Sequence, residues 1–171
     1  MIDGGKCYLR AIEPHDVELV YAWENDERVW RVSGTTEPLS RERIARFIEE
    51  QSYDIYATRQ LRLMIEAEGV AVGTLDIFDF DPRHLRFGIG ILIYAAEHRR
   101  KGYARAAIGA VAEYARARLG MKQIWASVAA DNEASIRLFE ECGFTRCGTR
   151  RAWLRTVDGY IDEHEYQLLF E

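Results

Sequence analysis

The residues with the clearest chemical potential form one short basic segment, Arg99-Arg100-Lys101-Gly102-Tyr103-Ala104. A run rich in β-forming residues precedes it, and a helical pattern begins directly after Gly102. The first backbone N–H groups of a helix have no partners within the helix and lie at the positive end of its dipole, so they attract anions. Gly102 and Ala104 let a phosphate oxygen approach the main chain, and the three cations add charge. The segment therefore predicts a site for a ligand with several negative charges, such as a pyrophosphate.

A basic turn whose cations are only solvated is the alternative for this segment. Two common phosphate motifs do not occur in the sequence. It has no GxxxxGK[ST] pattern, and Gly88-Ile89-Gly90 lies within an apolar strand pattern instead of opening a helix. These observations argue against a P-loop and against a dinucleotide fingerprint. A different class of phosphate-bearing cofactor is therefore expected.

Residue spacing predicts the elements that must position this segment. The expected strands are residues 7–11, 61–65, 70–80, 86–94, 124–128, 145–154 and 160–170. Four helices are expected. The first begins at Pro14, the second covers residues 40 to about 51, the third covers residues 104–119, and the fourth begins at residue 131 or 132 and ends at about 142. The order is β-α-α-β-β-β-α-β-α-β-β. It predicts an α+β fold, with a mixed, mostly antiparallel sheet of about seven strands and helices on both faces.

Composition limits the classes of protein to consider. The 171 residues, 48% of them hydrophobic and 12% aromatic, suit one domain over residues 1–171. A formal charge of −5, with no basic stretch longer than the segment at residues 99–101, argues against a nucleic-acid partner. No apolar run is long enough to cross a membrane, so no membrane partner is expected. Cys7, Cys142 and Cys147 lack CxxC spacing and no histidine pair has metal-ligand spacing, so we expect a reducing cytoplasm and no metal.

Two motifs together resemble the GNAT acetyltransferase superfamily. Arg99-x-x-Gly102-x-Ala104 is similar to its motif of Arg or Gln, two residues, Gly, one residue, and Gly or Ala. The segment from Asn132 to Phe144 resembles the family's N-x-x-(A/S)-x-x-(L/F)-(Y/F)-x-x-x-G-F block. The resemblance implies the GNAT fold, acetyl-CoA as cosubstrate, and direct transfer of its acetyl group to an amine. Glu-Glu-Cys-Gly-Phe and the Asp158-Gly159 turn resemble the spermidine and ribosomal-protein N-terminal acetyltransferase branches.

The resemblance also implies a set of cofactor-binding residues. In the family, the main chain of the strand before the loop pairs with the pantetheine arm, the loop holds the pyrophosphate, and an asparagine lies near the pantetheine. These roles correspond to Leu92, Ile93 and Tyr94, to Arg99, Arg100, Lys101, Gly102, Tyr103, Ala104 and Arg105, and to Asn132, with Phe139 packing against the sulfur end. Each role has a structural alternative: core side chains for Leu92 and Ile93, a solvated cation for Arg105, and a helix cap for Asn132.

The acid that protonates the leaving thiolate is not where the family usually has it. Relatives often place a tyrosine at the position of Phe139, and a phenyl ring has no proton to give. Either the thiolate leaves unaided, or Tyr94 or Cys142 substitutes, or the expected reaction does not occur. The last case would make the protein a non-catalytic acyl-CoA-binding module or sensor.

The general base also departs from the family pattern. Relatives commonly carry a glutamate near the middle of the strand before the loop, and this chain has Ile89 there. Glu37, next to Pro38, and Asp76, within Gly73-Thr74-Leu75-Asp76-Ile77, are the candidate carboxylates. Each could equally be a solvated surface acid, and a chain of water molecules could replace both.

The acceptor and the assembly stay open. A polyamine, a protein N-terminus, an amino sugar and an antibiotic amine all fit the resemblance, so the partner is a small-molecule or peptide amine. Relatives often dimerise, and the C-terminal hairpin with Trp153 offers an edge for a homodimer.

Overall fold

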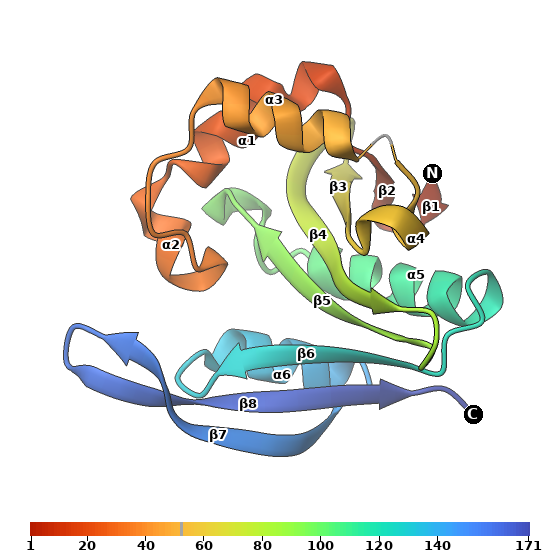
Figure 1. The fold of residues 1–171 in the computed structure, drawn as a ribbon, viewed down its shortest axis with the longest axis vertical. Coiled ribbons are helices and arrows are strands. Elements are labelled where there is room, and N and C mark those ends of the chain that lie inside the picture. The colour runs from red at the N-terminus through yellow and green to blue at the C-terminus, as the bar shows by residue number, and fades with distance from the viewer. Residues whose placement is uncertain (52) are drawn as a thin grey trace.

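One mixed sheet extends through the molecule, with helices on both of its faces (Figure 1). The computed structural model describes residues 1–51 and 53–171. Within these residues the sheet has eight strands in the order β1-β2-β3-β4-β5-β6-β8-β7. The strands are β1 (Ile2–Asp3), β2 (Tyr8–Ala11), β3 (Leu61–Ala67), β4 (Val70–Asp81), β5 (Arg86–Ile93), β6 (Gln123–Ala129), β7 (Thr145–Thr156) and β8 (Gly159–Leu169). The predicted fold class is confirmed, and the two-residue β1 adds one strand to the seven expected.

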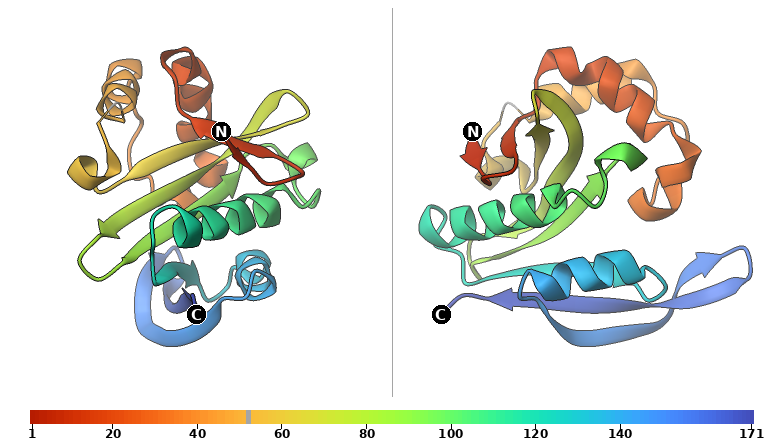
Figure 2. Two further views of the ribbon diagram at one scale, coloured as in Figure 1. Left: turned by 90° about the vertical axis from the view of Figure 1, so that its right-hand side faces the viewer. Right: turned by 180° about the vertical axis from the view of Figure 1, so that it is seen from behind.

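The helices divide between the two faces of the sheet (Figure 2). They are η1 (Pro14–Asp16), α1 (Val17–Glu24), α2 (Glu27–Ser33), α3 (Arg41–Glu50), α4 (Ile55–Thr58), η2 (Ala96–His98), α5 (Tyr103–Ala117) and α6 (Glu133–Glu141). Helices α5 and α6 cover one face over a large core, in which the helix residues Ile108 and Val111 are fully buried. Helices α1 and α3 cover the other face of the N-terminal half over a smaller core that includes Met64.

Two short helices were not predicted from the sequence. Helix α2 has seven residues and buries only Val29 among them, so it lacks the apolar stripe that identifies an amphipathic helix. Helix α4 is one turn long, and the Asp54 side chain begins it by accepting hydrogen bonds from the backbone N–H groups of Tyr56 and Ala57. Both helices arise from capping side chains rather than from periodicity.

Strands β5 and β6 form the parallel pair of this sheet, and they pair over a very short length. Three residue pairs join them, of which Gly88 with Trp125 is the last. Beyond this point β5 continues to Ile93, still paired with β4, and β6 continues to Ala129, still paired with β8. The two strands therefore separate toward their C-terminal ends and leave an opening in the middle of the sheet (Figure 1).

Gly88 marks the place where this pairing ends. A Cβ atom there would lie 2.4 Å from Phe78 Cε2 and 2.8 Å from Trp125 Cε2. The rings of Phe78 and Trp125 meet edge to face, with centroids 5.2 Å apart, directly over the glycine. Gly90, two residues further along β5, has only Phe78 Cε1 near its Cβ position, at 3.7 Å.

We predict that Gly88→Ala lowers the free energy of unfolding by about 1–3 kcal/mol, because the new methyl group must displace two packed rings. Gly90→Ala, on the same strand with ordinary contact distances, is the matched control and should change the stability by less than about 1 kcal/mol. Urea unfolding followed by tryptophan fluorescence measures both. Equal stability of the two variants would show that the contact between the rings and the strand is not tight.

Candidate functional site

The basic segment lies where β5 ends and α5 begins. Gly102 is the N-cap residue of α5 in the left-handed conformation, with φ 86°, and no side chain caps the helix. The first hydrogen bond of the helix runs from Ala106 N–H to the Gly102 carbonyl at 3.0 Å. In the described part of the chain, no group accepts a hydrogen bond from the six successive backbone N–H groups of residues 100–105. These donors are available to a ligand at the positive end of the α5 dipole.

The cations of this segment have different surroundings. Arg99 turns back, and its guanidinium donates to the carbonyl oxygens of Ile93 at 3.0 Å and Tyr94 at 2.9 Å. Arg99 therefore ties the loop to the end of β5. Arg100 and Lys101 are exposed, and no carboxylate among the described residues pairs with either. Arg105 lies 3.5 Å from Glu141, so it is partly neutralised.

The end of β5 combines a free backbone edge with buried side chains. Ile93 belongs to the large core, so the structural alternative is observed for its side chain, whereas Leu92 is half-buried and belongs to neither core. Tyr94 stacks on Trp23 with ring centroids 4.2 Å apart. Burial, with a further contribution from the negative charge of Glu24, raises the pKa of the Tyr94 hydroxyl. Tyr94 therefore keeps its proton and can act as a donor.

Across the opening, β6 leads into α6. Asn132 caps this helix, and its side-chain oxygen accepts from Ser135 N–H at 3.2 Å. Phe139 is buried and meets Phe144 edge to face at 5.1 Å between centroids, so it is part of the core. Cys142 is half-buried, and burial raises the pKa of its thiol. The structural alternatives for Asn132 and Phe139 are thus both observed, and neither excludes contact with a ligand in the opening.

Asp76 lies on the sheet face opposite α5, because its neighbours Leu75 and Ile77 both point into the core beneath α5. Arg62 on β3 holds it with two hydrogen bonds, Nε to Oδ1 at 2.6 Å and Nη2 to Oδ2 at 2.9 Å. The same guanidinium bonds Glu24 of α1 at 2.6 Å. Two carboxylates around one guanidinium leave a net charge of about −1 in a largely buried cluster.

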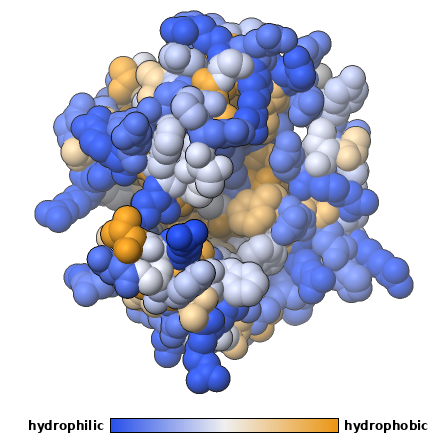
Figure 3. Space-filling model, turned by 60° about the vertical axis from the view of Figure 1, so that its left-hand side comes forward, coloured by the Kyte–Doolittle hydropathy of each residue, from blue (hydrophilic) through white to orange (hydrophobic). Residues whose placement is uncertain are grey.

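Asp76 is also the direct cross-strand neighbour of Gly90 on β5. Since Gly90 has no side chain and only Phe78 Cε1, at 3.7 Å, lies near its Cβ position, this face of β5 is not filled beside Asp76. Asp76 also lines a pocket of ≈ 230 Å³, together with Phe47, Gln51 and Phe78. Figure 3 faces the ends of β5 and β6, where the surface is hollowed between mostly hydrophilic regions and hydrophobic side chains are exposed. Asp76 therefore borders a cleft on the face of the sheet opposite α5.

Glu37, the other candidate base, is exposed and pairs with Arg43. No contact joins it to Asp76 among the residues that the structure describes. The structure does not bring the two candidate carboxylates together, and a role for Glu37 stays a prediction.

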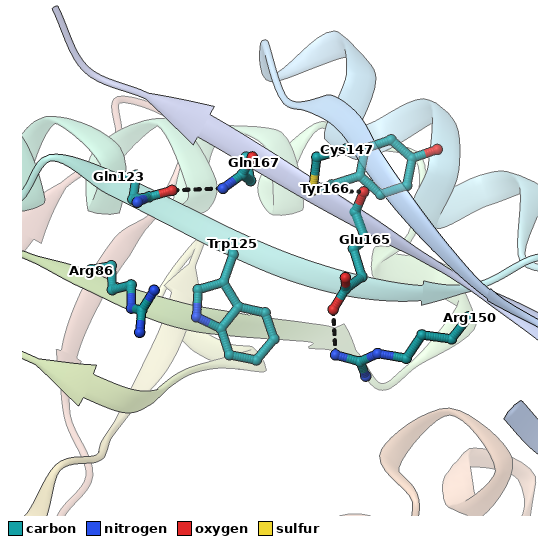
Figure 4. Close-up of a pocket in the computed structure, with 8 residues that line it drawn as sticks. All are labelled: Arg86, Gln123, Trp125, Cys147, Arg150, Glu165, Tyr166 and Gln167. Carbon is teal, nitrogen blue, oxygen red and sulfur yellow. Dashed lines mark hydrogen bonds and ion pairs between the residues drawn. The ribbon is translucent and has the colours of Figure 1, made fainter. Parts of the chain in front are cut away.

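A further pocket of ≈ 250 Å³ lies at the paired end of β5 and β6, around Trp125 (Figure 4). Its polar side chains satisfy one another: Gln167 donates to Gln123 at 2.8 Å, and Arg150 bonds Glu165. This pocket is lined by residues of the paired segment, Arg86, Gln123 and Trp125, and most of its polar groups are already paired. It is therefore a poorer candidate than the opening.

Three residues that lie next to candidate site residues were not singled out from the sequence: Lys6, Glu24 and Arg62. Lys6 lies beside Gly102, with Nζ 3.3 Å from the glycine's Cβ position. A two-residue turn at Glu68-Gly69 would place Arg62 opposite Leu75, but a bulge at Ile65/Glu66 shifts the partner to Asp76. Neither contact follows from spacing in the sequence.

A model described as an acetyltransferase (GNAT) domain matches residues 6–145 of the chain. The chain belongs to the GNAT acetyltransferase family. The predicted family is thereby confirmed, and the protein is an acyltransferase with acetyl-CoA as its cosubstrate. Family membership favours an enzyme over the non-catalytic binding module.

Similar proteins agree with the predicted branch of this family. The acetyltransferase is 29% identical over 171 residues to the uncharacterized N-acetyltransferase YoaA of Bacillus subtilis, covering 99% of this chain and 96% of the relative. It is 28% identical over 141 residues to the spermidine N(1)-acetyltransferase of Vibrio cholerae, covering 82% and 79%. A crystal structure of spermidine N-acetyltransferase from Vibrio cholerae in complex with CoA and spermine superposes with a TM-score of 0.85 at 23% identity, covering 96% of this chain and 95% of that one. This superposition confirms the fold.

No helix among the described residues of the acetyltransferase is both long and apolar enough to cross a membrane. Its predicted cytoplasmic location and homodimer stay predictions.

We predict that Gly102→Ala weakens binding of CoA about tenfold, because the new Cβ atom intrudes on the helix end at which the phosphate would approach the main chain. Isothermal titration calorimetry measures the dissociation constant. Gly120→Ala is the matched control, since Gly120 is also left-handed, with φ 62°, but follows the far end of α5. If both variants bind CoA as the wild type does, the helix end is not the phosphate site.

Proposed function

We propose that this acetyltransferase transfers the acetyl group of acetyl-CoA to a primary amine on a cationic acceptor, with the opening between β5 and β6 as the cofactor site. The observation that carries the proposal is the coincidence of two sets of free backbone groups. The unpaired edge of β5 and the six free N–H groups of residues 100–105 meet at the same end of the opening. The β5 edge suits the amides of a pantetheine arm, and the N–H groups of residues 100–105 suit a pyrophosphate.

The residues of the loop fit a phosphate-bearing cofactor. Arg99 fixes the loop against β5, and Gly102 leaves the main chain accessible. Arg100 and Lys101 supply positive charge that no carboxylate of the described chain neutralises. We therefore assign the pyrophosphate to the N–H groups of residues 100–105, with these two side chains as screening cations. Asn132 and the start of α6 form the opposite border of the opening.

The acceptor amine is assigned to the space above Gly90, beside Asp76. Acetyl-CoA supplies the acetyl group as a thioester. The amine nitrogen forms a bond to the acetyl carbon, the carbon–sulfur bond breaks with its electron pair going to sulfur, and one amine proton passes to the Asp76 carboxylate. Arg62 holds that carboxylate in one orientation with two hydrogen bonds. Asp76 is thus the proposed base, and Arg62 is a positioning residue.

The leaving group is proposed to depart as a thiolate without an acid from α6. Phe139 has no proton to give and is packed in the core. A thiol has an ordinary pKa of about 8.5, so a thiolate is a tolerable leaving group near neutral pH. Tyr94, which follows β5, remains protonated because burial raises the pKa of its hydroxyl, and that hydroxyl donates a hydrogen bond to Glu24.

A cationic acceptor is supported by the net charge of the acidic cluster. Glu24, Arg62 and Asp76 together carry about −1 beside the cleft, which attracts an ammonium group and raises its local concentration. The similarity to spermidine acetyltransferases supports the same class. Polyamines are therefore the first acceptors to test, ahead of amino sugars and peptide N-termini.

A thiol-release assay over a panel of polyamines, amino sugars, aminoglycosides and peptides tests the proposal. We expect turnover with polyamines, and Asp76→Asn should lower kcat/KM for the amine by about 10–100-fold through loss of the base and of one negative charge. The KM for acetyl-CoA should change by less than about twofold, because Asp76 lies on the acceptor side.

Two further variants make this test specific. Glu113→Gln removes an exposed acid of α5 and should leave kcat/KM unchanged. Glu37→Gln tests the other candidate base. A larger loss in Glu37→Gln than in Asp76→Asn would contradict the assignment of the base, and no turnover with any amine despite CoA binding would contradict the proposed function.

A further inference from the structure

We propose that Lys6, from the turn between β1 and β2, is an additional cofactor-binding residue that contacts the pyrophosphate from outside the loop. The inference rests on the proposed function, because it takes the helix end at Gly102 as the pyrophosphate site. Neither of the two motifs discussed above contains Lys6, which is about a hundred residues from the loop in sequence.

The Lys6 side chain lies directly over Gly102. Its Nζ is 3.3 Å, its Cδ 3.6 Å and its Cε 4.0 Å from the position that a Cβ atom on Gly102 would occupy. The ammonium group therefore borders the space that the missing side chain leaves open. An oxygen seated on the free N–H groups at this helix end would be within reach of it.

The turn that carries Lys6 is held against the first turn of α5. Gly4 N–H donates to the Cys7 carbonyl at 2.9 Å, and Gly5 N–H donates to Asp3 Oδ1 at 2.7 Å, which closes the turn. Gly4 approaches the helix so closely that a Cβ atom would lie 3.0 Å from the Ala106 carbonyl oxygen. Lys6 is therefore anchored at its backbone, and its reach toward Gly102 is set by packing rather than by a free terminus.

The positive charge of Lys6 and the positive end of the α5 dipole have no negative partner among the described residues. A lysine ammonium next to a helix N-terminus sets a full positive charge against the positive end of the dipole. No carboxylate of the described chain lies within ion-pair distance of Lys6, whereas Arg105 has Glu141 and Arg99 has two carbonyl oxygens. The Lys6 ammonium and the N-terminus of α5 are both positive and lie close together, so a negatively charged group between them would be stabilised by both. Lysine suits phosphate in this role because its ammonium is a compact charge with three donors.

The test compares CoA binding by the wild type, Lys6→Gln, Lys6→Arg and Arg118→Gln, by calorimetry at fixed ionic strength. Arg118→Gln is the charge-matched control, because it removes one positive charge at the far end of α5. We expect Lys6→Gln to raise the dissociation constant about tenfold, as for loss of one charge-assisted hydrogen bond. Lys6→Arg should recover most of the affinity, and Arg118→Gln should bind as the wild type does. With saturating acetyl-CoA, kcat and the amine KM of Lys6→Gln should stay within about twofold.

Dephospho-CoA identifies the phosphate involved. If Lys6 contacts the pyrophosphate, Lys6→Gln weakens the binding of dephospho-CoA by the same factor as the binding of CoA, since both ligands contain that group. If Lys6→Gln and the wild type bind dephospho-CoA with the same dissociation constant, Lys6 contacts the 3′-phosphate instead, and the inference is overturned. Unchanged CoA affinity in Lys6→Gln would also overturn it, while leaving the loop assignment intact. A wild type that does not bind CoA would overturn the proposed function and the inference together.

Discussion

Strands β5 and β6 run in parallel yet share only three residue pairs, and the opening proposed as the cofactor site begins where that pairing stops. Gly88 and Trp125 form its last pair, and the Trp125 ring covers the glycine. Beyond this pair, β5 stays paired with β4 and β6 stays paired with β8, so the two strands separate without losing these hydrogen bonds. The segments that follow the two strands, the phosphate loop and the start of α6, consequently border the same opening. The main chain of β5 is exposed between them.

A helix end with free N–H groups is costly unless the rest of the helix is well anchored. An N-cap side chain typically contributes about 1 kcal/mol, and α5 has none. Ala107, Ile108, Val111 and Ala115 are each 0% exposed, so burial along one stripe of α5 stabilises the helix by several times that amount. The core can therefore hold an uncapped N-terminus in place, where its donors are available to a ligand. Packing and binding are linked through the same fifteen-residue helix.

The parts of the site that lie within one element could be predicted from the sequence. The helical spacing that begins after Gly102 and the capping residue Asn132 both gave positions that the structure reproduces. The contacts between elements could not be predicted. The pairing of Arg62 with Asp76 depends on a β-bulge, which shifts the register by one residue and so changes which side chain faces the carboxylate. Lys6 reaches Gly102 only because the β1–β2 turn packs on α5, a contact between residues far apart in sequence.

The free N–H groups of residues 100–105 and the open edge of β5 are together the proposed binding surface for the cofactor. Residue-resolved amide hydrogen exchange, with and without saturating CoA, tests it most directly, because a hydrogen bond to the ligand slows exchange at the amide that donates it. We expect CoA to slow exchange at residues 100–105 and at part of residues 89–93, with little change in the closed β7–β8 hairpin. Saturated CoA binding with unchanged exchange in both segments would contradict it.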